Sequence, residues 1–271
     1  MKASPRRTLP PALISSVPNL RDAGNGYATR DGGRVRTGLL YRAASLHQIS
    51  DDDLTKLDRL GLKTVYDLRT EFAVKLAADQ LPSGVNYVRL DVLKDSKLAS
   101  REAQLRGMLA NPKSAGKFLG EGKAADVMKA IYREFVSLPS ARASYRQLFT
   151  GLAGLDRCPA LYHCDAGKDR TGWANAALLT LLGVPYEIVL QDYLHSGDLV
   201  LPTYAKLIQA FTAAGGDQEI LLAIFGVRTE YLQAAFDEMH RHFGAIEGYF
   251  SNGLGIAAAS QQALRELFVE W

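Results

Sequence analysis

One stretch of the sequence brings a thiol, two basic groups and two carboxylates together. It spans residues 163–172 and reads HCDAGKDRTG. Five residues separate Cys164 from Arg170, and Thr171 follows the arginine directly. A thiolate is a strong nucleophile, and the planar guanidinium fork of an arginine can bind two oxygens of one phosphate. The spacing therefore predicts that Cys164 attacks a phosphorus atom whose oxygens Arg170 holds.

Two apolar segments position this stretch. Residues 159–163 (PALYH) predict a short buried strand, and residues 171–182 predict a central apolar helix. In α/β proteins, ligands bind at the carboxyl ends of the strands, and the free amides at the start of a helix attract anions. Gly167 lets the backbone turn tightly. The predicted phosphate-binding residues are Asp165, Ala166, Gly167, Lys168, Asp169, Arg170 and Thr171.

Two neighbours of the nucleophile have expected supporting parts. We expect the Thr171 hydroxyl to hydrogen-bond the sulfur and His163 to order the loop through hydrogen bonds. Cys158 is predicted to be a structural thiol, with a redox partnership with Cys164 as the alternative. The two cysteines do not have the spacing of a zinc pair, and we predict neither a metal nor a cofactor.

Other glycine-rich motifs do not match. Gly167-Lys168 is followed by Asp169 where an ATP-binding loop has Ser or Thr. A dinucleotide fingerprint beginning at Gly24 would need a third glycine where the chain has Thr29.

The rest of the chain predicts an α/β fold. Strands are expected at 38–42, 63–69 and 86–92, and a helix capped by Ser50 is expected to run to Leu60 and stop at Gly61. Residues 94–122 are polar, with a helical pattern at 100–109. Further helices are expected at 124–138, 141–155, 186–195, 203–214, 228–243 and 257–271. This order predicts a central, mainly parallel sheet flanked by helices, with a helical C-terminal layer. We expect one domain over 17–271 after a flexible leader, 1–16.

Composition limits the function classes. The 271 residues are 47% hydrophobic and 23% charged, with a net charge of +3, which excludes a mainly disordered chain. So small a surplus does not predict nucleic-acid binding. No segment approaches the about 20 apolar residues of a membrane helix. We expect a cytoplasmic protein, while export without a standard signal peptide stays open, and the sequence does not predict an oligomeric state.

The HC-x5-R-T pattern is the signature of cysteine-dependent phosphatases, and the longer stretch resembles the atypical tyrosine phosphatases of the mycobacterial PtpB type. The resemblance extends over about residues 17–265. It rests further on residues 19–22 (NLRD), 40–44 (LYRAA), 66–69 (YDLR), 192–196 (DYLHS) and 226–232 (GVRTEYL).

The resemblance implies a cysteine-phosphatase fold and activity on phosphotyrosine, with phosphoserine, phosphothreonine and phosphoinositides as further substrates of some members. The expected partners are phosphotyrosine-containing proteins or small phosphomonoesters, and a phosphoinositide lipid is the alternative. The implied functional residues are Cys164, Lys168, Asp169 and Arg170. The resemblance also implies a helical lid, for which 199–225 with a hinge at Gly215-Gly216 is the candidate; a plain helical hairpin is the alternative.

Some roles stay open on the sequence alone. Asp165 departs from related loops and brings the loop's formal charge to zero, which argues against highly phosphorylated inositol substrates. The general acid is Asp169, Asp91 or Asp95. Two further pairs, Asp67 with Arg69 and Arg21 with Asp22, are expected to support the loop together with Arg42. The rival classes are an inactive phosphate-binding module and a sulfurtransferase.

Overall fold

The computed structural model describes residues 13–98 and 111–271. The helix expected at 100–109 and most of the expected leader lie outside these residues. The described end of the leader packs against the rest of the chain: Ile14 is buried, and the Ser16 amide donates to the Asp53 carboxylate at 2.9 Å. The packed part of the chain therefore begins before residue 17.

The sheet brings several strand ends to one edge. Its order is β1-β3-β6-β4-β5, where β3 (Leu40–Ala43), β6 (Ala160–His163), β4 (Thr64–Asp67) and β5 (Asn86–Arg89) run parallel and β1 (Arg21–Asp22) runs antiparallel to β3. In the register, His163 lies opposite Ala43 on one side and Asp67 on the other. The residues that follow β6 thus emerge between the ends of two neighbouring strands, as the predicted mainly parallel sheet requires.

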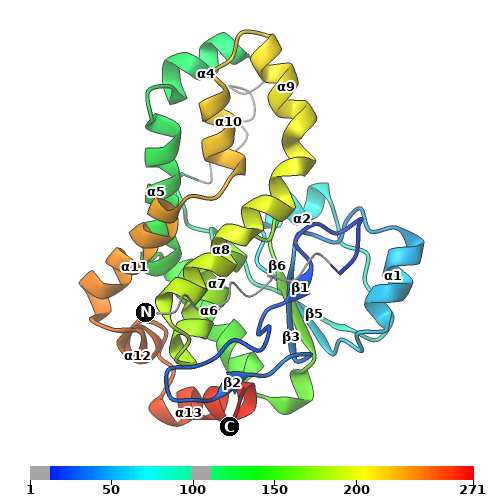
Figure 1. Ribbon diagram of the computed structural model, residues 1–271, viewed down its shortest axis with the longest axis vertical. Helices are drawn as coiled ribbons and strands as arrows, with labels where there is room; N and C mark the ends of the chain where they lie inside the picture. Colours follow the sequence, from blue (N-terminus) through cyan, green and yellow to red (C-terminus); the bar gives the residue numbers. More distant parts are fainter. Residues whose placement is uncertain (1–12, 99–110) are drawn as a thin grey trace, which may run out of the picture.

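Helices cover both faces of the sheet, and the strands alternate between two hydrophobic clusters. In β6, Leu161 belongs to the cluster on the α1 face (Asp51–Asp58), whereas Ala160 and Tyr162 belong to the larger cluster on the opposite face. Figure 1 shows α1 on one side of the sheet and α6, α7 and α8 on the other. The other helical segments in the described chain are α2 (Glu71–Leu76), α4 (Pro112–Leu119), α5 (Lys123–Ser137), α6 (Pro139–Leu152), η2 (Leu155–Arg157), α7 (Arg170–Leu181), α8 (Tyr186–Val200), η3 (Leu201–Tyr204), α9 (Ala205–Ala213), α10 (Gln218–Phe225), α11 (Thr229–Phe243), α12 (Ile246–Gly248), η4 (Tyr249–Gly253) and α13 (Ala258–Phe268).

The central helix α7 explains why the loop before it is held rigidly. It is apolar on nearly every side, and all of its residues except Arg170 and Thr180 are buried. A helix of this kind belongs in the core of a protein. The Trp173 indole, fully buried, donates to the Tyr249 hydroxyl at 3.2 Å. The first turn of α7 is therefore a fixed platform for the residues that precede it.

The structure differs from the predicted elements at helix ends and in short elements that were not predicted, among them α2, α4 and β1. Ser50 caps α1 as expected, and α8 continues to Val200. The last predicted helix is wrong at its end: α13 stops at Phe268, and β7 (Val269–Glu270) pairs with β2 (Arg34–Val35). Two residues are too few for a strand pattern to be recognised in sequence.

The segment proposed as a lid folds as η3, α9 and α10. Gly215, with φ at +84°, lies between α9 and α10. Figure 1 shows these two helices beside α4, beyond one end of the sheet. Among the described residues, no helix is long and apolar enough to cross a membrane.

Candidate active site

Cys164 lies at the start of a tight loop between β6 and α7. The residue is buried, with 1% of its surface exposed. Gly167, at the tip of this loop, has φ at +67°, and a Cβ atom there would lie 2.1 Å from the Ala43 carbonyl oxygen. Only glycine fits both the left-handed conformation and so close an approach. The loop is therefore pressed against the end of β3.

Side chains and a backbone amide from distant segments hold the loop by its carbonyl groups. The Gly167 carbonyl accepts hydrogen bonds from Asn19 Nδ2 at 2.7 Å and from Arg42 Nη2 at 2.8 Å. The Ser45 amide donates to the Asp165 carbonyl at 3.0 Å. Because these carbonyls are bound from outside the loop, its amides remain available to an anion at the start of α7.

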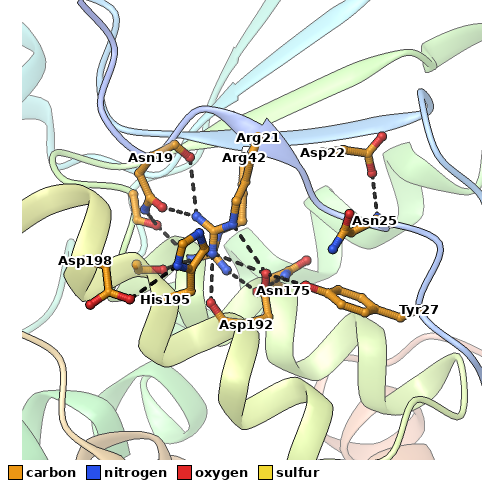
Figure 2. Close-up of polar contacts among 12 residues, drawn as sticks. Asn19, Arg21, Asp22, Asn25, Tyr27, Arg42, Asn175, Asp192, His195 and Asp198 are labelled. Atoms are coloured by element: carbon orange, nitrogen blue, oxygen red, sulfur yellow. Dashed lines mark hydrogen bonds and ion pairs between the residues drawn. The ribbon is translucent and has the colours of Figure 1, made fainter. Parts of the chain in front are cut away.

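A buried ion cluster orients the anchors Arg42 and Asn19, and we call it the Asp192 cluster: Arg21, Arg42 and Asp192. Arg42 belongs to the cluster, and Arg21 Nη1 donates to Asn19 Oδ1. Figure 2 shows both guanidinium groups directed at Asp192. The carboxylate lies 3.3 Å from Arg21 Nη2 and 2.7 Å from Arg42 Nη1, and Ser196 Oγ accepts from both arginines at 3.1 and 3.2 Å. Burial, against the attraction of Asp192, lowers the pKa of Arg21 to about 10. Arg21 therefore stays charged at neutral pH.

The predicted pairing of Arg21 with Asp22 is wrong. Successive residues of a strand point to opposite faces of the sheet, so Arg21 enters the core while Asp22 turns away. The Asp22 carboxylate instead accepts from the amides of Gly24, Asn25 and Gly38. The true partner, Asp192, is distant in sequence, and only its place in the DYLHS motif marked it.

A second buried cluster lies behind the nucleophile, and we call it the His163 cluster: Asp67, Arg69, Asp79 and His163. Arg69 Nη2 lies 2.7 Å from Asp67 and 2.5 Å from Asp79, which confirms the predicted Asp67–Arg69 pair. The sequence did not predict a role for Asp79. His163 Nε2 lies 3.2 Å from an Asp79 oxygen, and Nδ1 lies 3.1 Å from the Cys164 carbonyl.

His163 is positively charged in this arrangement. Nδ1 faces a carbonyl acceptor, and Nε2 lies beside the Asp79 carboxylate without forming a hydrogen bond to it. Burial lowers the pKa of His163, but the carboxylates of Asp67 and Asp79 outweigh it and raise that pKa to about 8. His163 and Arg69 in turn outweigh the burial of Asp67 and hold its pKa well below the usual range. The ligand atoms of Asp67, Asp79 and His163 lie within 4.8 Å of one another, but the Arg69 guanidinium already provides the cation that both carboxylates bind.

Two basic side chains of the loop have partners in the protein. The Arg170 guanidinium donates to the Leu68 carbonyl at 3.3 Å and forms an ion pair with Asp165. The buried Lys168 ammonium binds the Asp169 carboxylate at 2.9 Å and the Ile224 carbonyl, in α10, at 3.0 Å. Lys168 thus ties the loop to the candidate lid.

The three candidate acids lie in different surroundings. Asp169 accepts from Tyr132, whose hydroxyl is 2.8 Å away and also contacts the Tyr193 hydroxyl. Asp91 accepts from the Glu71 amide at the start of α2, and Asp95 accepts from the Ser140 amide in the first turn of α6. Only Asp169 belongs to the loop itself.

Thr171 and Cys158 do not make the contacts with Cys164 that the sequence suggested. Within the described residues, the buried Thr171 hydroxyl has no hydrogen-bond partner, so the expected bond to the sulfur is not formed in this structure. Cys158 and Cys164 lie at opposite ends of β6. A four-residue strand is about 13 Å long, beyond the about 7 Å that a disulfide spans between Cα atoms. The redox alternative is therefore excluded in this fold.

Comparison with known proteins identifies relatives over nearly the whole chain. The model of a family described as "Tyrosine phosphatase family" matches residues 12–270. The Mycobacterium tuberculosis "Triple specificity protein phosphatase PtpB" is 30% identical over 258 residues, which cover 85% of this chain and 91% of that protein. A "Tyrosine-protein phosphatase" of Nostoc commune is 26% identical over 237 residues, which cover 85% of this chain and 74% of that one. A crystal structure of P. aeruginosa TpbA aligns at 17% identity over 73% of this chain and 96% of its own, with a TM-score of 0.33.

Proposed function

The chain belongs to the tyrosine phosphatase family, and we propose that it hydrolyses phosphotyrosine, and also phosphoserine and phosphothreonine, through a phosphocysteine intermediate. One observation carries the proposal: the buried Cys164 begins an anchored loop that ends in Arg170 at the first turn of α7. A nucleophile, a helix start and a guanidinium converge there, which is the arrangement that phosphoryl transfer requires.

In the first step, the Cys164 thiolate attacks phosphorus and the phosphorus–oxygen ester bond breaks. Arg170 and the loop amides bind the equatorial oxygens, whose negative charge they stabilise in the transition state. The leaving phenolate or alkoxide takes up a proton. His163 places its positive charge behind the Cys164 carbonyl, next to the nucleophile.

In the second step, water attacks phosphorus, the sulfur–phosphorus bond breaks, and inorganic phosphate leaves with the thiolate restored. We assign Asp169 to this step as the group that accepts the proton of the attacking water. Lys168 and Tyr132 both donate to its carboxylate and hold it in the loop that begins at Cys164. Asp91 and Asp95 remain candidates for the acid of the first step.

The mechanism is tested by replacing the nucleophile. We expect Cys164→Ser to abolish turnover of p-nitrophenyl phosphate and to keep binding tungstate, because the loop amides and Arg170 remain. Arg170→Lys keeps the charge and loses the two-pronged contact, so we expect kcat/KM to fall about 100-fold or more. Turnover by Cys164→Ser at the wild-type rate would overturn the proposal.

The part of Asp169 is tested with two leaving groups. If Asp169 acts in the second step, Asp169→Asn lowers kcat equally for p-nitrophenyl and phenyl phosphate, and phosphocysteine accumulates in a burst of nitrophenol. If it is instead the acid, phenyl phosphate, the poorer leaving group, suffers more and no burst appears. Asp91→Asn and Asp95→Asn, assayed in parallel, show which of these carboxylates serves the leaving group.

A further inference from the structure

The partner of Arg170 in this structure is itself an anion. The Asp165 carboxylate forms an ion pair with Arg170 Nη2, the guanidinium that the proposed mechanism gives to the substrate phosphate. The arginine side chain is 12% exposed and the aspartate side chain 48%. A buried binding group is therefore covered from the solvent side by a carboxylate that can move.

Only the side chain of Asp165 is free to respond to a ligand. Its carbonyl is fixed by the Ser45 amide, and the second guanidinium nitrogen of Arg170 is fixed by the Leu68 carbonyl. A phosphate that takes up the guanidinium must either displace the Asp165 carboxylate or bind beside it. In the first case the phosphate competes with an internal anion, and in the second it experiences like-charge repulsion.

The other charges of the loop do not relieve this repulsion. Lys168 is buried and bound to Asp169 and to the Ile224 carbonyl, so its charge is already shared inside the protein. Once a phosphate holds Arg170, Asp165 is left as an exposed, unneutralised negative group next to the ester. A second anion on the substrate there would be repelled, and a cation would be attracted.

We propose that Asp165 is a specificity-determining residue: it competes with the substrate phosphate for Arg170 and, once displaced, selects phosphotyrosine peptides that carry a cationic residue next to the phosphotyrosine. This rests on the proposed phosphatase function. It assigns to Asp165 the role of rejecting substrates with several phosphates, so that polyphosphorylated inositol lipids are poor substrates. Negative selection of this kind is as effective as added attraction.

The substrate test uses two phosphotyrosine peptides that differ only in having Lys or Glu on both sides of the phosphotyrosine. We expect the wild-type chain to prefer the Lys peptide about tenfold in kcat/KM at low salt, and Asp165→Asn to reduce that preference to about threefold or less. Asp165→Glu keeps the charge and is expected to keep the preference. Asp31→Asn, an exposed carboxylate near Gly183 beyond the far end of α7, is the matched control and should leave the ratio unchanged.

The second test needs no catalysis. Calorimetric titration with tungstate reports on anion binding by Arg170 and the loop amides, and we expect Asp165→Asn to bind tungstate about tenfold more tightly than wild type because the internal competitor for Arg170 is gone. If no phosphoester is turned over, the phosphatase proposal fails while this titration still judges Asp165.

Three results would overturn the inference. The first is an unchanged peptide preference in Asp165→Asn. The second is unchanged tungstate affinity in that variant. The third is faster wild-type hydrolysis of phosphatidylinositol bisphosphate in vesicles than of the Lys peptide, which would mean that the site beside Asp165 accepts polyanionic lipids.

Discussion

The two buried ion clusters around the loop differ in how their charges are matched. The Asp192 cluster sets two arginines against one carboxylate, and Arg21 keeps its proton near neutral pH. The His163 cluster sets two carboxylates against one arginine and a histidine, so it is balanced only while His163 is protonated.

This difference separates two tasks. The Asp192 cluster holds the loop's shape, because Arg42 binds the Gly167 carbonyl. The His163 cluster places a titratable charge behind the nucleophile, because His163 contacts the Cys164 carbonyl. A charge that holds shape needs to be permanent, whereas the charge behind Cys164 is lost when the histidine loses its proton. Three experiments test whether the two clusters differ in this way.

The largest effect is expected from Asp192→Asn. The substitution removes the carboxylate that neutralises two buried arginines, and breaking a buried pair from one side costs about 3–5 kcal/mol of unfolding free energy. Urea denaturation measures it. Asp198→Asn, on the same helix with its side chain 81% exposed, is the control and should change stability little. A loss no greater than the control's would mean that the Asp192 cluster does not hold the loop.

An intermediate effect is expected from pH. The carboxylates of Asp67 and Asp79 raise the pKa of His163 from 6.5 to about 8, against the effect of burial. The stabilisation of the fold by protonated His163 is therefore complete below about pH 6.5 and is lost as pH rises through about 8. The shift corresponds to about 2 kcal/mol. Urea denaturation at pH 6 and pH 9 measures the loss.

The same pH series distinguishes the two clusters. Asp79→Asn removes the nearer carboxylate of His163, so we expect it to flatten the loss between pH 6 and pH 9. Asp192→Asn leaves His163 and both of its carboxylates in place, so we expect it to keep the loss that His163 causes despite its lower overall stability. Equal slopes in the wild type and Asp79→Asn would refute the assignment of the charge to His163.

The sequence predicted what lies close together along the chain. The loop was recognisable because Cys164, Gly167 and Arg170 are contiguous, and α7 was recognisable because its apolar run is long. The Asp67–Arg69 pair was predicted for the same reason. These features are local, and local patterns follow from the chain's own periodicity.

Arg42 was expected to support the loop and does so through the Gly167 carbonyl, but the other polar partners escaped prediction because they act across the fold. Asn19, Asp79 and Asp192 reach their partners through pairings of up to 171 residues in separation, which no spacing rule reveals. Arg21 and Asp22 were predicted to pair because they are adjacent in sequence. The prediction failed because neighbouring residues of a strand point to opposite faces of the sheet. Polar anchors of this kind follow from tertiary packing, and only the fold shows which carboxylate meets which arginine.

The smallest effect on stability is expected from two tyrosines, each of which binds a carboxylate of one cluster. Tyr27 donates to Asp192 at 3.1 Å and is 2% exposed, whereas Tyr87 donates to Asp67 at 2.8 Å and is 39% exposed. A buried hydrogen bond to a charged group contributes about 1.5 kcal/mol or more, while at a half-exposed site water replaces the lost hydroxyl. We therefore expect Tyr27→Phe to destabilise the fold by about 1.5 kcal/mol and Tyr87→Phe by about 0.5 kcal/mol. Urea denaturation of both variants at pH 7 measures the two losses of unfolding free energy. If Tyr87→Phe, which removes the shorter hydrogen bond, loses more than Tyr27→Phe, then bond length and not burial controls the loss.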